Sequence, residues 1–277
     1  MFTTIEEVDF QQVVDTWNQG FSDYLLPIKV DQKALEQRIQ SLKLSQKRSA
    51  LYSINGEFAG IILLGIQTFQ GVKTMWIGGM AVIPEYRQKK VASKLMDYAE
   101  EMAKENQCEH LILEVIAANE RARKLYKAKG FQIINELAVG RIMLPTTTNK
   151  RSPIHFKAIT SKEQTLNEEK WTPWQNRCIF SDKNYEIYQE TAKIGSISFN
   201  LAEEASGKSV ILKQLQLLGQ KDTSLITNIL LTLKEQENSD IVKLTNVDMA
   251  TSEYAELEKI GIQLQLTQFQ LAKKMTL

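Results

Sequence analysis

The order of predicted elements in the second half of this sequence repeats the order in the first half. In each half a strand is followed by a helix, a second strand, a second helix, a glycine and a closing strand. The segments are 74–82, 91–106, 110–115, 118–129 and Gly130 in the first half, and 210–218, 223–234, 241–247, 254–260 and Gly261 in the second. We interpret this as a degenerate internal repeat, which restricts the chain to two related halves of mixed α/β structure.

The boundary between the halves is predicted from length and local composition. At about 150 residues per domain, 277 residues predict two domains. Residues 144–153, LPTTTNKRSP, are polar, rich in threonine and bracketed by prolines, which is typical of a connector. We therefore expect one domain over residues 1–147 and a smaller one over residues 154–277.

The charge and cysteine content exclude several functional classes. The formal net charge is +1, so nothing global favours binding to nucleic acid or to an anionic membrane. The two cysteines, Cys108 and Cys178, and the two histidines, His110 and His155, are far apart in sequence and predict no disulfide framework and no metal site. The N-terminus has no leader-like pattern and no run of 18 apolar residues occurs, so we expect a cytoplasmic protein without a membrane span.

The region before residue 83 predicts helices followed by a β-meander. Apolar residues recur at helical spacing over residues 9–20, and Asp31 is a candidate cap for a second helix. Asn55-Gly56 and a second turn at Gln70-Gly71 separate three apolar runs, which predicts three antiparallel strands. Trp17, Phe21 and Tyr24 continue the first helical stripe, and a core role is favoured over a ligand cage.

The segment PEYRQKKVAS joins a predicted strand to a helix that begins near residue 91. Free backbone N–H groups and the positive end of the helix dipole make such a junction a ready anion site. Arg87, Lys89 and Lys90 add three positive charges, which would suit a pyrophosphate. The alternative is an ordinary solvated turn.

Taken together, PEYRQKKVASKLM, then LEV at 113–115, Asn119, and LYKAKGF at 125–131 resemble the GNAT superfamily of acyl-CoA-dependent N-acetyltransferases. The family loop reads Arg/Gln-x-x-Gly-x-Gly/Ala. Arg87 and Ala92 fit its ends, and Lys90 stands at the inner glycine position, where a lysine can serve if its φ is negative. The resemblance covers about residues 1–144 and implies a central mixed sheet flanked by helices, followed by a second, degenerate GNAT-like domain.

The resemblance also implies where acetyl-CoA, as co-substrate, would bind. The backbone of Met80, Ala81 and Val82 would pair with the pantetheine arm, and Asn119 would bond the pantetheine and fix the last helix. Oxyanion stabilisation would come from an N–H near Ala81 or Val82. The pyrophosphate would lie against the loop formed by Arg87, Gln88, Lys89, Lys90, Val91, Ala92 and Ser93.

Two side chains are candidates for proton transfer. Tyr126 would act as general acid toward the departing thiolate, because a phenol is protonated at neutral pH; the alternative is an aromatic residue packed on Phe131. Glu114 would act as base, through water, for the incoming amine; the alternative is an ordinary salt-bridging glutamate. The acceptor would lie between residues 18–27 and a turn at residues 137–141.

The second half lacks the corresponding residues. Residues 219–222, Gly-Gln-Lys-Asp, replace the phosphate loop and carry an aspartate, while Leu257 and Asn246 stand near the positions of Tyr126 and Glu114. We therefore expect an N-acetyltransferase that moves an acetyl group from acetyl-CoA to a primary amine in a ternary complex, without a metal. The acceptor would be a small molecule or a peptide, and a homodimer is an open option. The alternative is a CoA-binding or protein-interaction module that has lost turnover.

Overall fold

A computed structural model describes residues 1–26, 28–146, 153–159, 168–204, 207–219 and 221–276. The chain divides into two compact units, and each unit contains residues from both halves of the sequence. The first comprises Met1–Val115, Asn119–Ile133 and Leu271–Leu277, and the second Ile116–Ala118 and Ile134–Gln270. Most of the predicted connector, residues 147–152, lies outside the described residues, and the division at 147–154 stays a prediction.

The first unit is a mixed sheet with helices on both faces. Its strands lie in the order β1-β2-β3-β4-β5-β12, with only the last residues of β12 in this unit. Neighbours are antiparallel up to β4, and β4 and β5 are parallel. The elements are β1 (Phe2–Thr4), η1 (Ile5–Glu7), α1 (Phe10–Gly20), α2 (Gln32–Ser41), β2 (Ala50–Ile54), β3 (Glu57–Phe69), β4 (Val72–Val82), η2 (Pro84–Tyr86), α3 (Val91–Glu105), β5 (His110–Ile116) and α4 (Glu120–Ala128).

The turn signals in the sequence produce the meander. Asn55 and Gly56 both have positive φ, 52° and 87°, as do Gln70 and Gly71, at 48° and 80°. Two positive φ values define the type I′ turn, whose twist matches that of paired strands. Asp31 caps α2 by accepting a hydrogen bond from the N–H of Ala34 at 2.7 Å. These predicted features are confirmed.

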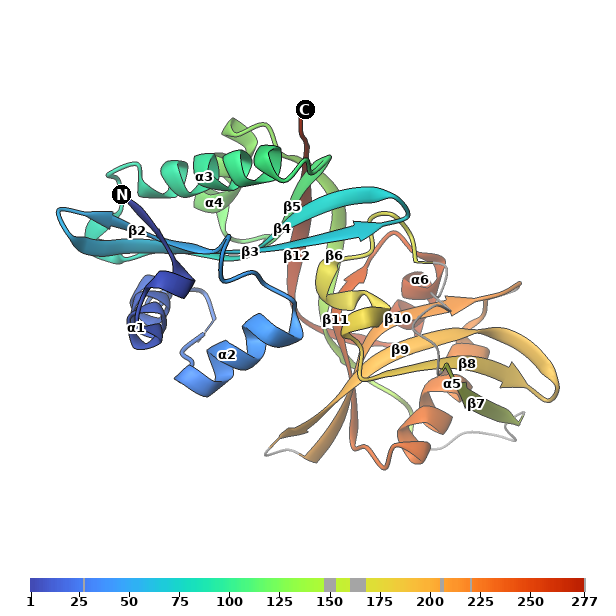
Figure 1. Cartoon of the computed structure of the whole chain (residues 1–277). Coiled ribbons are helices and arrows are strands. Elements are labelled where there is room, and N and C mark those ends of the chain that lie inside the picture. The colour runs from blue at the N-terminus through green and yellow to red at the C-terminus, as the bar shows by residue number, and fades with distance from the viewer. Residues whose placement is uncertain (27, 147–152, 160–167, 205–206, 220, 277) are drawn as a thin grey trace. The chain divides into compact units, whose positions relative to one another are not determined.

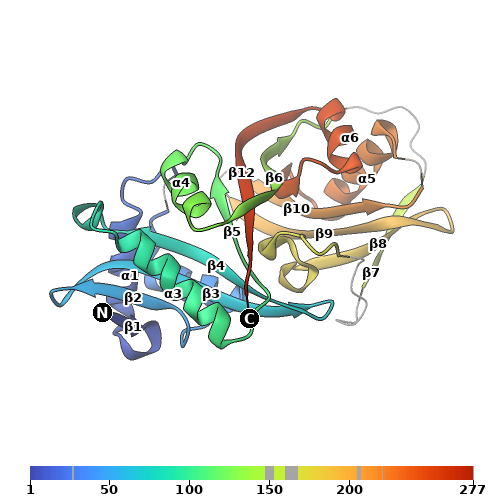
Figure 2. The same ribbon diagram turned by 90° about the horizontal axis from the view of Figure 1, so that it is seen from above.

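The helices of the first unit cover opposite faces of its sheet. Figure 1 shows α1 and α2 on one face of strands β2 to β5, with α3 and α4 on the other. Figure 2, seen from above, shows α3 lying across β3 and β4. α1 approaches β4 closely: a Cβ at Gly20 would lie 2.6 Å from that of Ala81, and one at Gly79 would lie 2.6 Å from the Trp17 ring. Small residues at these points therefore set the position of α1 on β4.

The second unit repeats this architecture. Its strands lie in the order β12-β6-β11-β10-β9-β8-β7, and β10 and β11 are its parallel pair. The elements are β6 (Gln132–Ile142), β7 (Ile154–Ala158), η3 (Trp174–Asn176), η4 (Cys178–Phe180), β8 (Lys183–Gln189), β9 (Ala192–Glu204), β10 (Gly207–Leu217), α5 (Thr223–Gln236), β11 (Ile241–Asp248), α6 (Ser252–Ile260) and β12 (Ile262–Lys274).

The two units share their strand register as well as their element order. The β3–β4 register leaves Gly78 as an extra residue, and the β9–β10 register leaves Lys213 as an extra residue. In each unit parallel pairing stops one residue before this bulge, at Ile77 and at Leu212. A bulge conserved in position between the halves supports the interpretation of the sequence as a repeat.

One predicted feature is wrong. The turn expected at residues 137–141 does not exist, because β6 is one strand from Gln132 to Ile142. Ala138 and Gly140 pair with β11 in the second unit, so the central residues are ladder positions. Gly140 allows close strand contact, since a Cβ there would lie 2.5 Å from the carbonyl oxygen of Gln263.

Candidate functional site

The loop between η2 and α3 exposes a row of backbone N–H groups. In the part of the chain that the structure describes, no residue accepts a hydrogen bond from the N–H groups of residues 88–93. The first intrahelical bond at this end runs from the N–H of Lys94 to the carbonyl of Lys90, at 3.1 Å. Unpaired N–H groups combine here with the positive end of a 15-residue helix, and this combination favours a negatively charged ligand.

The backbone of this loop is left-handed at two positions. Gln88 has φ 63°, and Lys90 has φ 61° and ψ 14°. The condition of a negative φ at Lys90 is therefore not met: the lysine adopts the left-handed conformation that a glycine would supply. Its side chain is exposed. Lys89 is also exposed, with its Nζ 4.9 Å from the centre of the Tyr86 ring.

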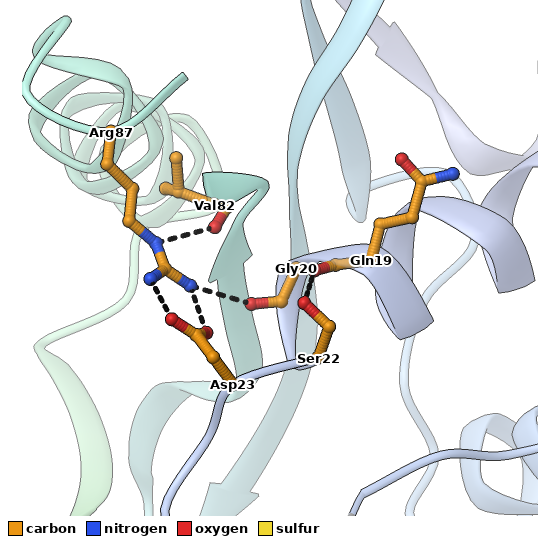
Figure 3. Close-up of polar contacts among 6 residues, drawn as sticks. All are labelled: Gln19, Gly20, Ser22, Asp23, Val82 and Arg87. Carbon is orange, nitrogen blue, oxygen red and sulfur yellow. Dashed lines mark hydrogen bonds and ion pairs between the residues drawn. The ribbon is translucent and has the colours of Figure 1, made fainter. Parts of the chain in front are cut away.

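Arg87 is engaged away from the N–H row. Its guanidinium forms a two-pronged ion pair with Asp23, in which Nη1 donates to Oδ2 and Nη2 donates to Oδ1 at 2.5 Å (Figure 3). Nη2 also donates to the carbonyl of Gly20 at 3.4 Å, and Nε donates to that of Val82 at 3.2 Å. Arg87, one of the three positive charges predicted for the loop, therefore forms an ion pair with the segment after α1.

β4 and β5 separate beyond Ile77 and Leu113, where their parallel register ends. We call this separation the splay. The hydrogen bonds between β4 and β3 show which backbone groups of β4 face the splay. The N–H of Ile83 donates to the carbonyl of Ala59 on β3, and the N–H groups of every second residue along β4 point in the same direction. Ala81 therefore faces β3, so it is not a candidate for oxyanion binding.

Met80 and Val82 point their backbone groups into the splay. The carbonyl of Val82 is taken by Arg87, and the carbonyl of Gly78 accepts a hydrogen bond from Nη2 of Arg38 at 2.8 Å. Met80 keeps an N–H and a C=O that β5 does not pair. An extended, amide-rich ligand would satisfy these groups as an added strand does.

Tyr126 lies near Tyr24, which in turn hydrogen-bonds the Asn119 side chain. Burial, and secondarily the neighbouring Tyr24 phenol, raise the pKa of Tyr126 well above its usual range. Burial also raises the pKa of Tyr24, and a hydrogen bond with the Asn119 side chain opposes this rise. Asn119 caps α4 by accepting from the N–H of Ala122 at 3.1 Å, so it fixes this helix. Tyr126 also packs on Phe131, with ring centres 6.0 Å apart.

Glu114 lies in a second group of contacts. The indole N–H of Trp76 donates to its Oε2 at 2.7 Å and so orients the carboxylate. Arg38 is close by: burial lowers the pKa of the guanidinium, and the charge of Glu114 opposes that fall. The guanidinium lies 5.8 Å from the centre of the Trp17 ring. Glu114 therefore sits in a polar, ordered environment at the end of the paired part of β5.

Sequence reasoning missed Asp23 and Arg38, and it interpreted Tyr24 as core. Asp23 pairs with a residue 64 positions away, and such a contact leaves no periodic signal. Tyr24 could have been found as the aromatic residue that continues the stripe beyond the end of α1. It is half-buried, and its ring contacts Phe21 edge-on at 5.1 Å.

The second unit has a splay too, but protein fills it. The side-chain amide of Asn176, in η3, donates to the carbonyls of Lys213, Thr245 and Asn246 at 2.7–2.9 Å. The Gln214 side chain donates to the carbonyl of Asn176 at 2.7 Å.

The helix that follows this second splay begins differently from α3. Asp222 caps α5 by accepting from the N–H of Leu225 at 2.8 Å, so a carboxylate occupies the end of the helix that would attract an anion. Gln220, in the loop predicted to replace the phosphate loop, lies outside the described residues.

Among the residues that the structure describes, no cluster of three or more His, Cys, Asp or Glu side chains could hold a metal ion. None of the described helices combines the length and apolar character needed to cross a membrane.

Comparison with known proteins finds a family model that matches this part of the chain. The model of the acetyltransferase (GNAT) family matches residues 10–131. N-alpha-acetyltransferase 30 of Dictyostelium discoideum is 32% identical over 83 residues, and thialysine N-epsilon-acetyltransferase of Bos taurus is 34% identical over 77 residues. These matches cover 30% and 28% of this chain, and the chain spans only 45% of the length of each relative.

The fold likeness extends over the whole chain. A tandem GNAT protein from the clavulanic acid biosynthesis pathway superimposes with a TM-score of 0.66, covering 100% of this chain and 99% of the other, at 12% sequence identity. A second GNAT-like half, as the repeat predicts, is consistent with this fold. The N–H row of residues 88–93 and the splay both lie within residues 10–131, the part of the chain that matches the GNAT acetyltransferase family.

Proposed function

We propose that this chain is an N-acetyltransferase that moves an acetyl group from acetyl-CoA to a primary amine by direct attack in a ternary complex. The observation that carries the proposal is the row of open N–H groups at residues 88–93, at the start of α3 and next to the splay. Such a row fits a diphosphate, and the exposed Lys89 and Lys90 supply positive charge beside it. Met80, with its N–H and C=O facing the splay, would pair with the pantetheine amides.

Acetyl-CoA supplies a thioester whose carbonyl carbon is open to attack. The amine nitrogen forms a bond to that carbon, the carbon–sulfur bond breaks, the nitrogen loses a proton and the sulfur gains one. Tyr126 is the donor to sulfur, because its raised pKa keeps the phenol protonated at neutral pH. Glu114, oriented by Trp76, takes the proton from the amine through water. The N–H of Met80 or Val82 would stabilise the oxyanion.

The amine acceptor is proposed at the level of chemical class. The relatives named above act on an α-amine and on the ε-amine of thialysine, and both are primary amines. A panel of peptides with free N-termini, lysine and thialysine therefore covers the first candidates.

The test combines binding and turnover. Calorimetry with CoA should show binding, and thiol release from acetyl-CoA with the amine panel should show turnover. Tyr126→Phe should lower kcat by about 10²-fold or more and leave the Kd for CoA unchanged. Tyr98→Phe is the matched control, since Tyr98 stacks on Phe2, 4.5 Å away, outside the site. Binding without thiol release from any amine would favour the non-catalytic module, and absence of binding would refute the proposal.

A further inference from the structure

The segment after α1 is held at both ends. At its far end the Asn18 side chain donates to the carbonyl of Val30 at 2.9 Å and accepts from the N–H of Val30 at 3.0 Å. At its near end the Asp23 carboxylate pairs with both Nη atoms of Arg87 (Figure 3). The second attachment reaches the first residue of the loop that carries the N–H row.

The Arg87 fork joins three separate elements. It bonds Asp23 after α1, the carbonyl of Gly20 at the end of α1, and the carbonyl of Val82 at the end of β4. A planar guanidinium with several donors fixes orientation as well as distance, which a single-point contact does not. A movement of residues 88–90 is therefore transmitted to Asp23 through the Arg87 ion pair.

The residue after Asp23 borders the candidate general acid. The N–H of Tyr24 bonds the carbonyl of Phe21 at 3.1 Å, and the Phe21 ring stacks obliquely on Trp17, with ring centres 4.6 Å apart. The Tyr24 phenol is close enough to Tyr126 to raise its pKa. The backbone position of Asp23 thus decides where this phenol lies against Tyr126.

We propose that Asp23 is a positioning residue which, through its ion pair with Arg87, couples the N–H row at residues 88–93 to the placement of Tyr24 beside Tyr126. The inference rests on the function proposed above: occupancy of the N–H row by the coenzyme orders the wall beside the catalytic phenol. The amine would then meet a formed site only when acetyl-CoA is present.

The ion pair persists across the working pH range. The hydrogen bond from Arg87 is the main cause that lowers the pKa of Asp23, and the same contact raises the pKa of Arg87. The pair would be lost only as the pH falls through the lowered pKa of Asp23, so it is no switch near neutral pH. Asp23 is 54% exposed, and exposed pairs contribute little to global stability. Its loss should change local order without unfolding the protein.

The experiment is amide hydrogen exchange on the full chain, with and without CoA. The matched control is Asp15→Asn, which removes an exposed carboxylate from α1, the helix that precedes Asp23; Asp15 accepts a hydrogen bond from Gln11 and not from Arg87. Without CoA, Asp23→Asn should raise exchange in residues 21–24 and 87–90 by about threefold over the control. With CoA, wild type and control should gain protection in both segments, whereas Asp23→Asn should gain it only in residues 88–93.

Two further variants separate charge from geometry. Asp23→Glu keeps a carboxylate and should restore much of the linked protection, while Arg87→Lys keeps the charge, loses the fork and should behave like Asp23→Asn. Protection of residues 21–24 by CoA in Asp23→Asn would overturn the coupling. If CoA protects no segment of the wild type, the proposed function fails instead. The coupling is then decided by the CoA-free comparison, where equal exchange in Asp23→Asn and Asp15→Asn refutes it.

Discussion

Replacement of Lys90 by glycine should stabilise this protein. Lys90 holds φ 61° and ψ 14°, the left-handed region, where an L-residue carries about 1–2 kcal/mol of strain. Glycine removes that strain, but its freer unfolded chain costs about 0.4–1 kcal/mol. The difference predicts a net gain of about 0.5–1 kcal/mol. The side chain is exposed, so no packing is lost to offset it.

The assay is thermal unfolding of Lys90→Gly alongside Lys90→Ala. At about 2–4 °C per kcal/mol for a chain of this size, the glycine variant should melt about 1–4 °C above wild type. The alanine variant loses the same charge but keeps a Cβ, so it should show no comparable gain. Equal Tm values for the two variants would refute the reasoning, because relief of charge repulsion would then explain any stabilisation.

Coenzyme affinity gives an independent check of the same site. Both variants remove one ammonium group beside the proposed diphosphate, so the Kd for CoA should rise several-fold in both and the increase should shrink at high salt. Glycine preserves the left-handed backbone and therefore the N–H row. A much weaker binding in Lys90→Gly than in Lys90→Ala would contradict an anion site built from backbone N–H groups.

Three other predictions follow from separate features. Gly79→Ala places a Cβ 2.6 Å from the Trp17 ring and should destabilise the first unit by about 1–3 kcal/mol, read from urea unfolding; an unchanged midpoint would contradict the packing of α1 on β4. Calorimetry should give one CoA per chain, because Asn176 closes the second splay, and a stoichiometry of two would refute that reading. Burial lowers the pKa of Lys213 to about 8, so between pH 8 and 10 the unfolded chain binds more protons there than the folded one. Stability should therefore rise with pH by up to about 3 kcal/mol relative to Lys213→Met, whose stability lacks this contribution; parallel pH profiles would count against a buried ammonium.

In the second unit, Lys213 and the η3–η4 segment occupy the region that corresponds to the candidate site of the first unit. It stands at the bulge that Gly78 occupies in the first unit. Its ammonium donates to the carbonyls of Gln175 and Phe180, at 2.7 and 2.8 Å. The same η3–η4 segment places Asn176 in the splay. Lys213 thus holds the η3–η4 segment in place, and Asn176 of that segment bonds the strand carbonyls at the second splay.

The sequence determined the order of elements, the I′ turns, the helix caps and the location of the anion loop. Each of these depends on neighbouring residues: two positive φ values at Asn55-Gly56, a carboxylate three residues before an N–H at Asp31, and a short junction between strand and helix. Features of this kind can be predicted from a short stretch of sequence. The resemblance to the family could also be detected from the sequence, because the motif residues lie close together along the chain.

Only the tertiary structure decided how these parts are used. The sequence predicted Arg87 as a phosphate ligand, yet its partner in the structure is Asp23, 64 residues away. Lys90 adopts the left-handed backbone conformation of the glycine that stands at this position in the family loop. The turn expected at residues 137–141 is instead the middle of β6, because these residues pair with β11. Long-range pairs and strand register depend on which surfaces fold against each other, and that information is distributed over the whole chain.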